Sequence, residues 1–404
     1  MHILYISQHF PPETGAAQGR AYEMSKNLSE LGNQVTVITG MPNYPEGKIY
    51  KDYQGKLFHK ENIDGVRVIR TFLVPDHKEG ALIRILNYLS FLISSILGGL
   101  FVKNVDLVYA SSPQLFVGLS GYILSLIHRA EFVLEIRDLW VDFAVHLGQL
   151  KNKFLIKSAK ILENFLYKRA DQIITVTNGF KEKIAADGID ENKMDVVTNG
   201  IDTNHFCPLT VDKDIMDIEA IADKFVIMYA GNIGTAQGLN VMLKAAEKTK
   251  DLKDIHYVLI GTGVKEDDLK KYKEEQGLNN VSFLGTKSKD EIVDYLCAAD
   301  ILLITLRDLP FFDITIPSKV FDYMATGKPL LIGVKGEARE IVEKAGAGSY
   351  FEPENSKQLA EEIINYYQGE YDLEKISKNA REFAVNNFSR AELAQKLNNI
   401  LNNV

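Results

Sequence analysis

The stretch FVIMYAGNIGTAQGL, residues 225–239, decides the fold. Its first six residues are mostly apolar and do not alternate with polar ones, which is typical of a strand buried on both faces of a parallel sheet. A loop carrying Gly231, Gly234 and Gly238 follows, and a helical pattern begins near residue 241. A strand, a glycine-bearing loop and a helix in this order predict an α/β unit that binds ligands at the carboxyl ends of its strands.

The same alternation of short apolar runs and helix-length segments extends over the whole chain. It predicts two Rossmann-like, doubly wound α/β domains that face each other across a cleft. We expect an N-terminal domain at 1–205 and a C-terminal domain at 206–384, with 210–224 as the linker. The strand candidates are 3–7, 35–39, 66–70, 105–110, 132–136, 172–176, 195–198, 225–230, 256–260, 281–284, 301–305 and 330–333, and helical segments include 21–30, 241–250, 267–276 and 361–367.

Composition and charge narrow the class of protein. The 404 residues carry a net charge of −8, which argues against a nucleic-acid partner because such proteins usually carry a basic excess. The two cysteines, Cys207 and Cys297, fit neither a disulfide framework nor a metal-site spacing. The first residues predict a buried strand rather than a signal peptide. We therefore expect a cytoplasmic protein.

An uncharged run at 85–101 lies between Arg84 and Lys103. It is short for a membrane span and is diluted by Asn87, serines and glycines, so we do not expect it to cross a bilayer. A helix lying in the membrane interface over about 81–103 and a helix packed on the first sheet both remain open.

The loop after the first strand, residues 10–20, occupies the ligand-binding end of the N-terminal sheet. Gly15, followed by Ala16, and Gly19 would let backbone amides approach an anion, and Arg20 could add positive charge. An ordinary surface turn is the alternative. In the second domain, Asn232, Gly234 and Gln237 occupy the equivalent loop and could likewise bind an anion, with a purely structural loop as the alternative.

The segment 312–329 contains the most specific pattern. Pro317 suits the first position of a helix that Gly327 and Pro329 close. Amides at the helix start, with Ser318 and Lys319, predict a diphosphate site, and Asp322 one turn later could accept hydrogen bonds from ribose hydroxyls. A solvated face is the alternative.

At these segments the sequence resembles family 4 of the retaining glycosyltransferases with the GT-B fold. The resemblance covers the whole length and rests on 5–20, 198–208, 261–263, 281–285, 299–300 and 322–329. The segments 41–45 and 137–140 resemble the fucosaminyltransferase-like (WbuB-like) branch of O-antigen and capsule enzymes.

The resemblance implies a nucleotide-sugar donor, and a UDP-sugar is more expected than a GDP-sugar. The donor could be a UDP-N-acetylfucosamine-like compound. The group transferred would be a hexosyl or N-acetylhexosaminyl group. The resemblance also implies a glycan or polyprenyl-diphosphate-linked acceptor bound mainly by the N-terminal domain, no metal ion or other cofactor, and a final helix at about 385–404 that returns to the N-terminal domain. Enzymes of this branch often act on polyprenyl-linked sugars, so 81–103, with 115–127 close by, could dock on the inner face of the cell membrane; helices that simply cover the first sheet are the alternative.

Several positions depart from the family pattern. The second glutamate of the usual Glu-x7-Glu motif falls on Asp322, and the first falls on Ile314, beside Asp313. The basic residues of the diphosphate clamp fall on Asn232 and Gln237, which leaves Lys319, with Arg307 as a second candidate, to supply the positive charge. The family's common active-site histidine falls near Arg137 and Asp138, which makes Asp138 a candidate for contact with the sugar or acceptor. We therefore assign Asp138, Lys319 and Asp313 to the reacting centre. Donor binding is assigned to Gly15, Ala16, Asn232, Gly234, Gln237, Gly285, Pro317, Ser318, Lys319 and Asp322.

Two alternatives from other classes remain. A sugar-nucleotide 2-epimerase shares the two-domain architecture and would act on a UDP-sugar without an acceptor. A catalytically silent partner subunit would bind the nucleotide and transfer nothing.

Overall fold

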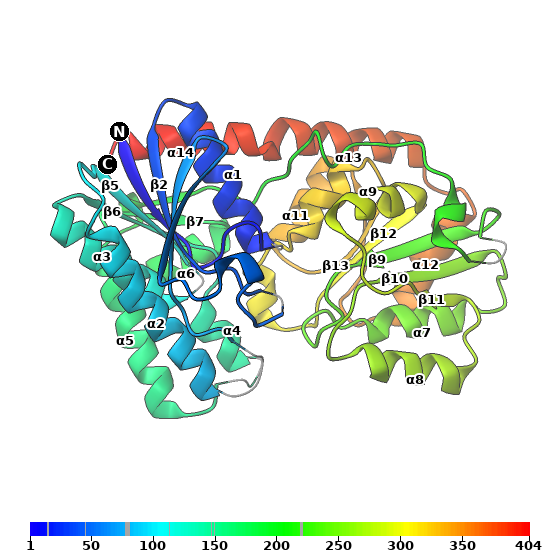
Figure 1. Cartoon of the computed structure of the whole chain (residues 1–404). Coiled ribbons are helices and arrows are strands. Elements are labelled where there is room, and N and C mark those ends of the chain that lie inside the picture. Colours follow the sequence, from blue (N-terminus) through cyan, green and yellow to red (C-terminus); the bar gives the residue numbers. More distant parts are fainter. Residues whose placement is uncertain are drawn as a thin grey trace. The chain divides into compact units, whose positions relative to one another are not determined.

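A computed structural model describes residues 1–404 except 14–15, 45, 77–80, 113, 147, 149 and 219–220, and leaves out the side chains of 16–17 and 81–82. The chain forms two compact units (Figure 1): unit 1 is Met1–Asn199 with Arg390–Val404, and unit 2 is Gly200–Ser389. Each unit is a twisted, mainly parallel sheet with helices on it, so the prediction of two Rossmann-like α/β domains is confirmed. Unit 1 ends before residue 205, where we placed the boundary.

The sheet of unit 1 has the order β3-β4-β2-β1-β5-β6-β7-β8. Ile3 of the central strand β1 pairs with Val35 on one side and Leu107 on the other, both in parallel register. Its strands are β1 (His2–Ile6), β2 (Gln34–Gly40), β3 (Phe58–Ile63), β4 (Val66–Thr71), β5 (Leu107–Ser111), β6 (Glu131–Ile136), β7 (Gln172–Thr175) and β8 (Met194–Val196).

One edge of this sheet departs from the predicted all-parallel arrangement. Strand β3, which the sequence analysis missed, pairs antiparallel with β4. Asp64 and Gly65 join the two strands with φ of 48° and 84°, as a tight hairpin turn with two left-handed residues requires.

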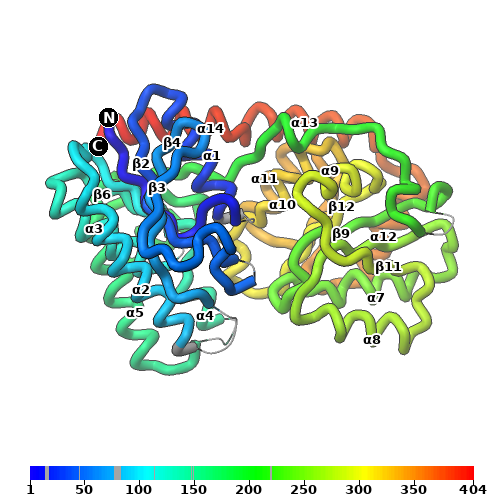
Figure 2. Tube along the Cα trace, in the orientation of Figure 1, coloured from blue at the N-terminus to red at the C-terminus, as the bar shows by residue number. Residues whose placement is uncertain are grey.

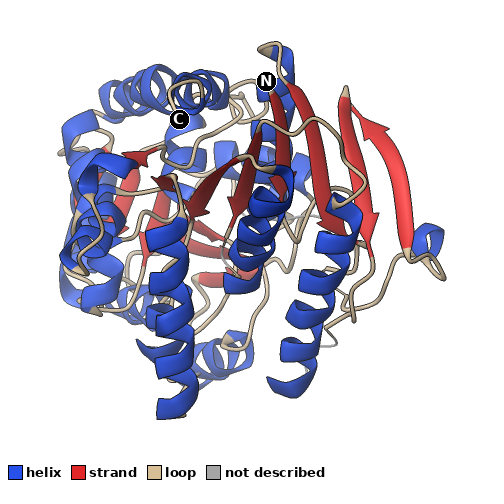
Figure 3. Ribbon diagram, turned by 90° about the vertical axis from the view of Figure 1, so that its left-hand side faces the viewer, coloured by secondary structure: helices blue, strands red, loops and turns tan. Residues whose placement is uncertain are grey.

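Helices lie on both faces of the unit 1 sheet, and Figure 3 shows them as blue rods against the red strands. They are α1 (Ala16–Glu30), α2 (Ala81–Gly99), α3 (Leu115–His128), α4 (Trp140–His146), α5 (Lys153–Arg169), α6 (Asn178–Ala186) and α14 (Arg390–Leu401), with short 3-10 turns at Lys51–Tyr53 and Glu191–Lys193. Of the helices in the described residues, none has the length and apolar character needed to cross a membrane.

The last helix of the chain belongs to unit 1. Helix α14 packs on α1, and Figure 2 traces the C-terminal segment back beside the N-terminal strands. Leu393 and Leu397 enter the same buried cluster as Ile3 and Tyr5. Asn33 donates a hydrogen bond to Asn398 Oδ1 at 2.8 Å, and Arg390 pairs with Glu23.

The sheet of unit 2 has the order β11-β10-β9-β12-β13-β14 and is parallel throughout its pairings. Its strands are β9 (Phe225–Ala230), β10 (Ile255–Ile260), β11 (Val281–Phe283), β12 (Ile301–Thr305), β13 (Leu330–Gly333) and β14 (Gly348–Tyr350). Its helices are α7 (Asn240–Lys248), α8 (Glu266–Gln276), α9 (Lys289–Ala298), α10 (Lys319–Ala325), α11 (Glu337–Ala345), α12 (Ser356–Tyr367) and α13 (Leu373–Phe388), with 3-10 turns at Lys213–Met216 and Pro310–Ile314.

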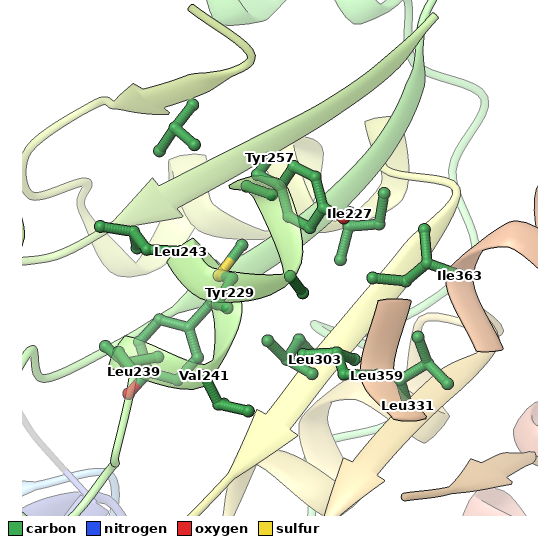
Figure 4. Packing of buried hydrophobic residues seen from close by; sticks show 14 of the residues in the cluster. Ile227, Tyr229, Leu239, Val241, Leu243, Tyr257, Leu303, Leu331, Leu359 and Ile363 are labelled. Carbon is green, nitrogen blue, oxygen red and sulfur yellow. The ribbon is translucent and has the colours of Figure 1, made fainter. Parts of the chain in front are cut away.

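The core of unit 2 forms where α7 and α12 cover the sheet. Figure 4 shows Ile227 of β9, Leu303 of β12 and Leu331 of β13 packed with Leu359 and Ile363 of α12. Burying side chains of this size stabilises a fold by about 1.5–3 kcal/mol each. Because this core fixes strands and helices together, it also fixes the loops at the carboxyl ends of the strands.

Candidate functional site

Three glycines meet at the carboxyl ends of the adjacent strands β9, β10 and β11. Gly231 and Gly261 have φ of 140° and 127°, and Gly285 has φ of 66°. Gly261 N donates to Gly285 O at 2.7 Å, and a Cβ on Gly261 would lie 1.9 Å from Gly231 O. Side chains are therefore excluded where these three loops touch, at the end of the sheet where α/β units bind ligands.

The loop after β9 brings together three residues of the predicted donor site. A Cβ on Gly234 would lie 2.6 Å from Asn232 Nδ2 and 2.7 Å from Gln237 Oε1, so both amide side chains close over this glycine. Gln237 Oε1 is buried and has no hydrogen-bond partner in the described part of the chain. Asn232 is exposed at the loop surface, so its amide remains accessible to a ligand.

Lys319 contributes the positive charge beside this loop. Its Nζ lies 5.1 Å from the centre of the Tyr229 ring, and a Cβ on Gly231 would come within 2.6 Å of it. Burial lowers the pKa of Lys319, an effect that the nearby Asp322 partly offsets. Among the described residues no carboxylate lies at salt-bridge distance from this ammonium group, although the Asp322 charge is nearby, which suits the group to an anionic ligand.

The start of α10 differs slightly from the prediction. The helix begins at Lys319 rather than at Pro317, although Val320 N already donates to Pro317 O at 3.0 Å. Ser318 has helical backbone angles and an exposed side chain that makes no capping hydrogen bond. Asp322 follows one turn later and is partly buried. The prediction of Pro317 as the first helical residue is therefore wrong by two positions, and the proline initiates the turn instead.

Tyr323 holds α10 in place, and the sequence analysis missed it. Its hydroxyl accepts a hydrogen bond from Ala230 N at 2.9 Å and donates to Ala230 O at 3.0 Å. The side chain is buried and lies one helical turn from Lys319. No pattern in the sequence distinguishes this tyrosine from an ordinary core aromatic residue, because its partner is a backbone group.

Asp313 lies in the 3-10 turn Pro310–Ile314. Its carbonyl oxygen packs so closely on Gly336 that a Cβ there would lie 1.8 Å away. Burial raises the pKa of the Asp313 carboxyl, Asp308 adds to the rise, and Lys335 opposes it. These contacts bring Asp313 to the α11 side of unit 2, and among the described residues no hydrogen bond or ion pair joins it to Lys319.

Asp138 belongs to unit 1 and follows β6 at the carboxyl end of the sheet. Desolvation raises its pKa to about 6, although the neighbouring Arg137 lowers it. The side chain still reaches solvent. A carboxyl group that ionises near pH 6 at this end of an α/β sheet is typical of a functional position.

Arg20 does not have the role that the sequence suggested. It is buried, and its Nε and NH2 atoms donate to Glu135 Oε1 at 3.0 and 2.8 Å. Tyr109 and Ser111 also donate to Glu135, while Arg20 donates to the carbonyls of Val197 and Thr198. The guanidinium is therefore saturated by internal partners and unavailable to an anion. A glutamate inside the buried strand 131–136 was the sequence signal for this pair.

The two remaining predicted residues of unit 1 fall in the first loop. Gly15 lies outside the described residues, and Ala16 begins α1. Gly285 belongs to the three-glycine contact described above. The structure thus brings together Asn232, Gly234, Gln237 and Lys319, with Pro317, Ser318 and Asp322 on the turn that carries the lysine.

Comparison with known proteins agrees with this architecture. Residues 17–205 match the family model described as Glycosyltransferase Family 4, and residues 211–383 match the model described as Glycosyl transferases group 1. A putative colanic acid biosynthesis glycosyl transferase, WcaI of Escherichia coli (strain K12), is 25% identical over 412 residues, which cover 99% of this chain and 100% of the relative. A probable glycosyltransferase, WbjE of Pseudomonas aeruginosa, is 26% identical over 263 residues, 64% of this chain and 65% of that protein.

Solved structures with the same fold include Anabaena HepE in complex with UDP and glucose, with a TM-score of 0.75 at 18% identity, covering 100% of this chain and 99% of that one. Sucrose-phosphate synthase from Thermosynechococcus elongatus has a TM-score of 0.79 at 16% identity and covers 100% and 98% of the two chains. The chain carries a Glycosyltransferase Family 4 domain followed by a Glycosyl transferases group 1 domain, and it is a glycosyltransferase of the GT-B fold.

Proposed function

We propose that this glycosyltransferase moves a hexosyl or N-acetylhexosaminyl group from a UDP-sugar to a glycan or polyprenyl-diphosphate-linked acceptor, as a step in the synthesis of a surface polysaccharide. The observation that carries the proposal is the Lys319 ammonium group, which lies against Gly231 and the Tyr229 ring and, within the described residues, forms no ion pair at salt-bridge distance, with Asp322 as a nearby charge. The UDP bound by the similarly folded HepE and the colanic acid role in the name of the WcaI relative support the nucleotide and the pathway class.

Within unit 2, we assign the donor diphosphate to Lys319, Ser318 and the amides of the 232–237 loop. A buried ammonium group and nearby backbone amide dipoles stabilise negative charge that develops on a leaving diphosphate. Asp322, one turn after Ser318, is assigned to the ribose hydroxyls, and the backbone near Gly285 to the base. We also assign Gly15 and Ala16 of unit 1 to binding of the donor phosphate.

We propose retention of configuration and no metal ion, with Asp138 near the reacting sugar and Asp313 in the place of the family's first glutamate. Activity in excess EDTA and the anomeric configuration of the product test these two points. The fucosaminyltransferase-like branch, suggested by 41–45 and 137–140, makes a UDP-N-acetylfucosamine-like sugar the first donor to try after the common ones.

The side chains of helix α2 favour the proposal that the acceptor is held at a membrane surface. Many of its large apolar side chains face outward, and polar or small ones face the protein. Its inner face carries small and polar side chains: Ser94 donates to Phe72 O at 2.5 Å, and Asn87 donates to Val74 O. Its outer face exposes a row of large apolar side chains. We call Ile85, Leu86, Leu89, Ile93 and Leu97 of α2, together with Leu100 and Phe101 in the turn directly after it, the α2 apolar face; they are 36–71% exposed.

The α2 apolar face continues onto α3, which packs beside it and exposes Leu126 and Ile127. Contiguous apolar surface of this kind usually marks an interaction site. Arg84 and Lys103 are exposed at its two ends, as in helices that lie in the interface of anionic membranes. We therefore propose that residues 81–103 associate peripherally with the inner face of the cell membrane.

Calorimetric titration with UDP, GDP and ADP tests the donor site. We expect UDP to bind and Lys319→Ala to weaken it by roughly 10- to 100-fold, since a hydrogen bond to a charged group contributes about 1.5–3 kcal/mol. Lys344→Ala, an exposed lysine at the end of α11, is the matched control and should bind like the unchanged protein.

The outcomes separate the competing functions. Binding of none of the three nucleotides contradicts the donor site. UDP binding with conversion of a UDP-sugar to its epimer in the absence of acceptor would identify an epimerase instead. Nucleotide binding without transfer to any acceptor would favour a silent partner subunit.

A further inference from the structure

A buried carboxylate organises the loop after β1 in unit 1. The Glu13 side chain is 2% exposed, and its Oε1 accepts hydrogen bonds from the backbone amides of Asn43 and Tyr44, both at 2.8 Å. Its Oε2 accepts from Phe10 N at 3.4 Å and contacts His9 Nδ1 at 3.0 Å. Backbone amides only donate, so both oxygens of Glu13 act as hydrogen-bond acceptors here.

This arrangement sets the tautomer of the neutral His9 ring. Because Glu13 only accepts, the proton of a neutral His9 must lie on Nδ1, and Nε2 is left with its lone pair. Ser7 Oγ also donates to the His9 carbonyl at 2.9 Å, so both the backbone and the ring are fixed. The ring is 21% exposed, and in the described part of the chain its Nε2 has no hydrogen-bond partner.

The loop around this pair is anchored independently of the histidine. Arg70, which is buried, donates to the carbonyl of Pro11 and pairs with Glu61. Glu13 Oε1 already ties the loop to residues 43 and 44. The His9 ring is therefore not needed to hold the loop together, and His9 itself lies in the loop that follows the carboxyl end of β1, where α/β units bind ligands.

We propose that His9 binds the acceptor substrate: its Nε2 accepts a hydrogen bond from a sugar hydroxyl of the acceptor, and Glu13 is the positioning residue that keeps Nε2 an acceptor. The ligand class is a molecule that presents a hydroxyl donor, and an exposed Tyr44, whose ring centre lies 6.0 Å from that of His9, provides an adjoining surface for a sugar ring. The inference rests on the proposed glycosyl transfer and adds an acceptor contact on unit 1 to it.

His9→Asn is the decisive variant. The asparagine amide can still donate to Glu13 from about the place of Nδ1, but nothing remains at the place of Nε2. The matched control is His59→Asn, which alters another partly exposed histidine of unit 1 that lies 3.9 Å from a glutamate. Glu13→Gln tests the positioning role, because an amide group that donates toward Nδ1 turns Nε2 into a donor.

The assay uses UDP-glucose, UDP-galactose and UDP-N-acetylglucosamine with octyl glucoside and octyl N-acetylglucosaminide as acceptors, and follows transfer and UDP-sugar hydrolysis together. We expect His9→Asn to lower kcat/KM for the acceptor about tenfold, as the loss of one hydrogen bond would, with UDP affinity, donor hydrolysis and the thermal midpoint unchanged. Glu13→Gln should reproduce the loss of transfer and lower the thermal midpoint as well.

Transfer by His9→Asn equal to that of the unchanged protein overturns the assignment, because the variant keeps the loop and removes only Nε2. An equal loss in His59→Asn also overturns it. If the unchanged protein binds UDP but transfers to neither acceptor and hydrolyses none of the donors, the proposed transfer itself is contradicted, and the inference is overturned with it.

Discussion

Tyr323 and Ala230 exchange two hydrogen bonds, one through each polar group of the Ala230 backbone. This contact fastens α10 to the last residue of β9, directly before Gly231. Lys319 stands at the start of the same helix, so the tyrosine determines where the ammonium group lies relative to the glycine loop.

Replacing Tyr323 with phenylalanine removes both hydrogen bonds while keeping the ring. We expect the free energy of unfolding to fall by about 1–3 kcal/mol, because a buried amide and carbonyl lose a partner. UDP affinity should fall as well, since α10 is no longer fixed. Chemical denaturation and calorimetry measure the two effects. Tyr295→Phe, on α9, is the control and should change neither.

Nucleotide binding should take up protons at alkaline pH. Burial lowers the pKa of Lys319 from its ordinary value of 10.5, and a bound diphosphate raises it again. At a pH between the lowered pKa of Lys319 in the free protein and its higher pKa in the UDP complex, the free protein has lost the proton that the complex holds. UDP affinity therefore falls as the pH rises. Calorimetry in buffers of different ionisation enthalpy detects the uptake. Lys319→Ala should abolish it, and uptake that persists in this variant would contradict the assignment.

Breaking the buried ion pair in unit 1 should be costly. Glu135→Gln leaves the Arg20 guanidinium buried without its counter-charge, for which we expect a loss of about 3–5 kcal/mol in unfolding free energy. Combining it with Arg20→Met should recover part of the loss, because the isolated charge is then gone. If the double variant is as unstable as Glu135→Gln alone, the stability loss comes mainly from the hydrogen bonds of Tyr109 and Ser111 to Glu135 and not from the charge pair.

The same pair gives unit 1 an acid-sensitive contribution. Burial opposes ionisation of Glu135, but Arg20 and Arg137 outweigh it and the pKa of Glu135 is lowered. The stabilisation is therefore fully present above the pKa of an unfolded glutamate, about 4.3, and is lost as the pH falls through the lowered value. Denaturation curves of Glu135→Gln should converge on those of the unchanged protein at acid pH.

Asp138 should shape the acid limb of the activity profile. Desolvation raises its pKa to about 6, so the carboxylate is the major form only above that pH. If the charged form acts at the reacting sugar, kcat should fall as the pH drops through about 6, and Asp138→Asn should be less active at pH 8 and lack this limb. A variant that keeps the same limb would assign the ionisation to another group.

The α2 apolar face should govern membrane association. We expect the protein to float with vesicles that contain anionic lipid, and Leu89→Ser combined with Ile93→Ser to reduce the bound fraction at least tenfold, since each buried leucine or isoleucine contributes about 1.5–3 kcal/mol. Leu252→Ser, an exposed leucine of unit 2, should have no effect. Absence of binding by the unchanged protein would remove the proposal.

The sequence predicted the buried strands well because their apolar runs do not alternate, as in residues 225–230 and 301–305. It missed β3, whose residues include His59, Lys60 and Glu61 and alternate between exposed and half-buried, as an edge strand does. It also missed β14, because three residues beginning with glycine carry no periodic pattern.

In the donor site, the residue types were predictable but their contacts were not. Glycines after β9 and a lysine near a proline can be read along the chain. The seating of Lys319 against Gly231 depends on Tyr323 binding a backbone group far away in sequence. Arg20 was misread for the same reason, since its partner Glu135 lies 115 residues away.

Because of helix α14, unit 1 is built from two separate segments of the chain, whereas unit 2 is built from one. Unit 2 is one continuous segment, Gly200–Ser389, whereas the core of unit 1 is completed by Leu393, Leu397 and Leu401 of α14, which follow unit 2 in the sequence. Although domains tend to fold in the order in which they are synthesised, the core of unit 1 stays incomplete until α14 has been made. Unit 2 can therefore complete its core from one stretch of chain, whereas unit 1 needs a segment made after unit 2.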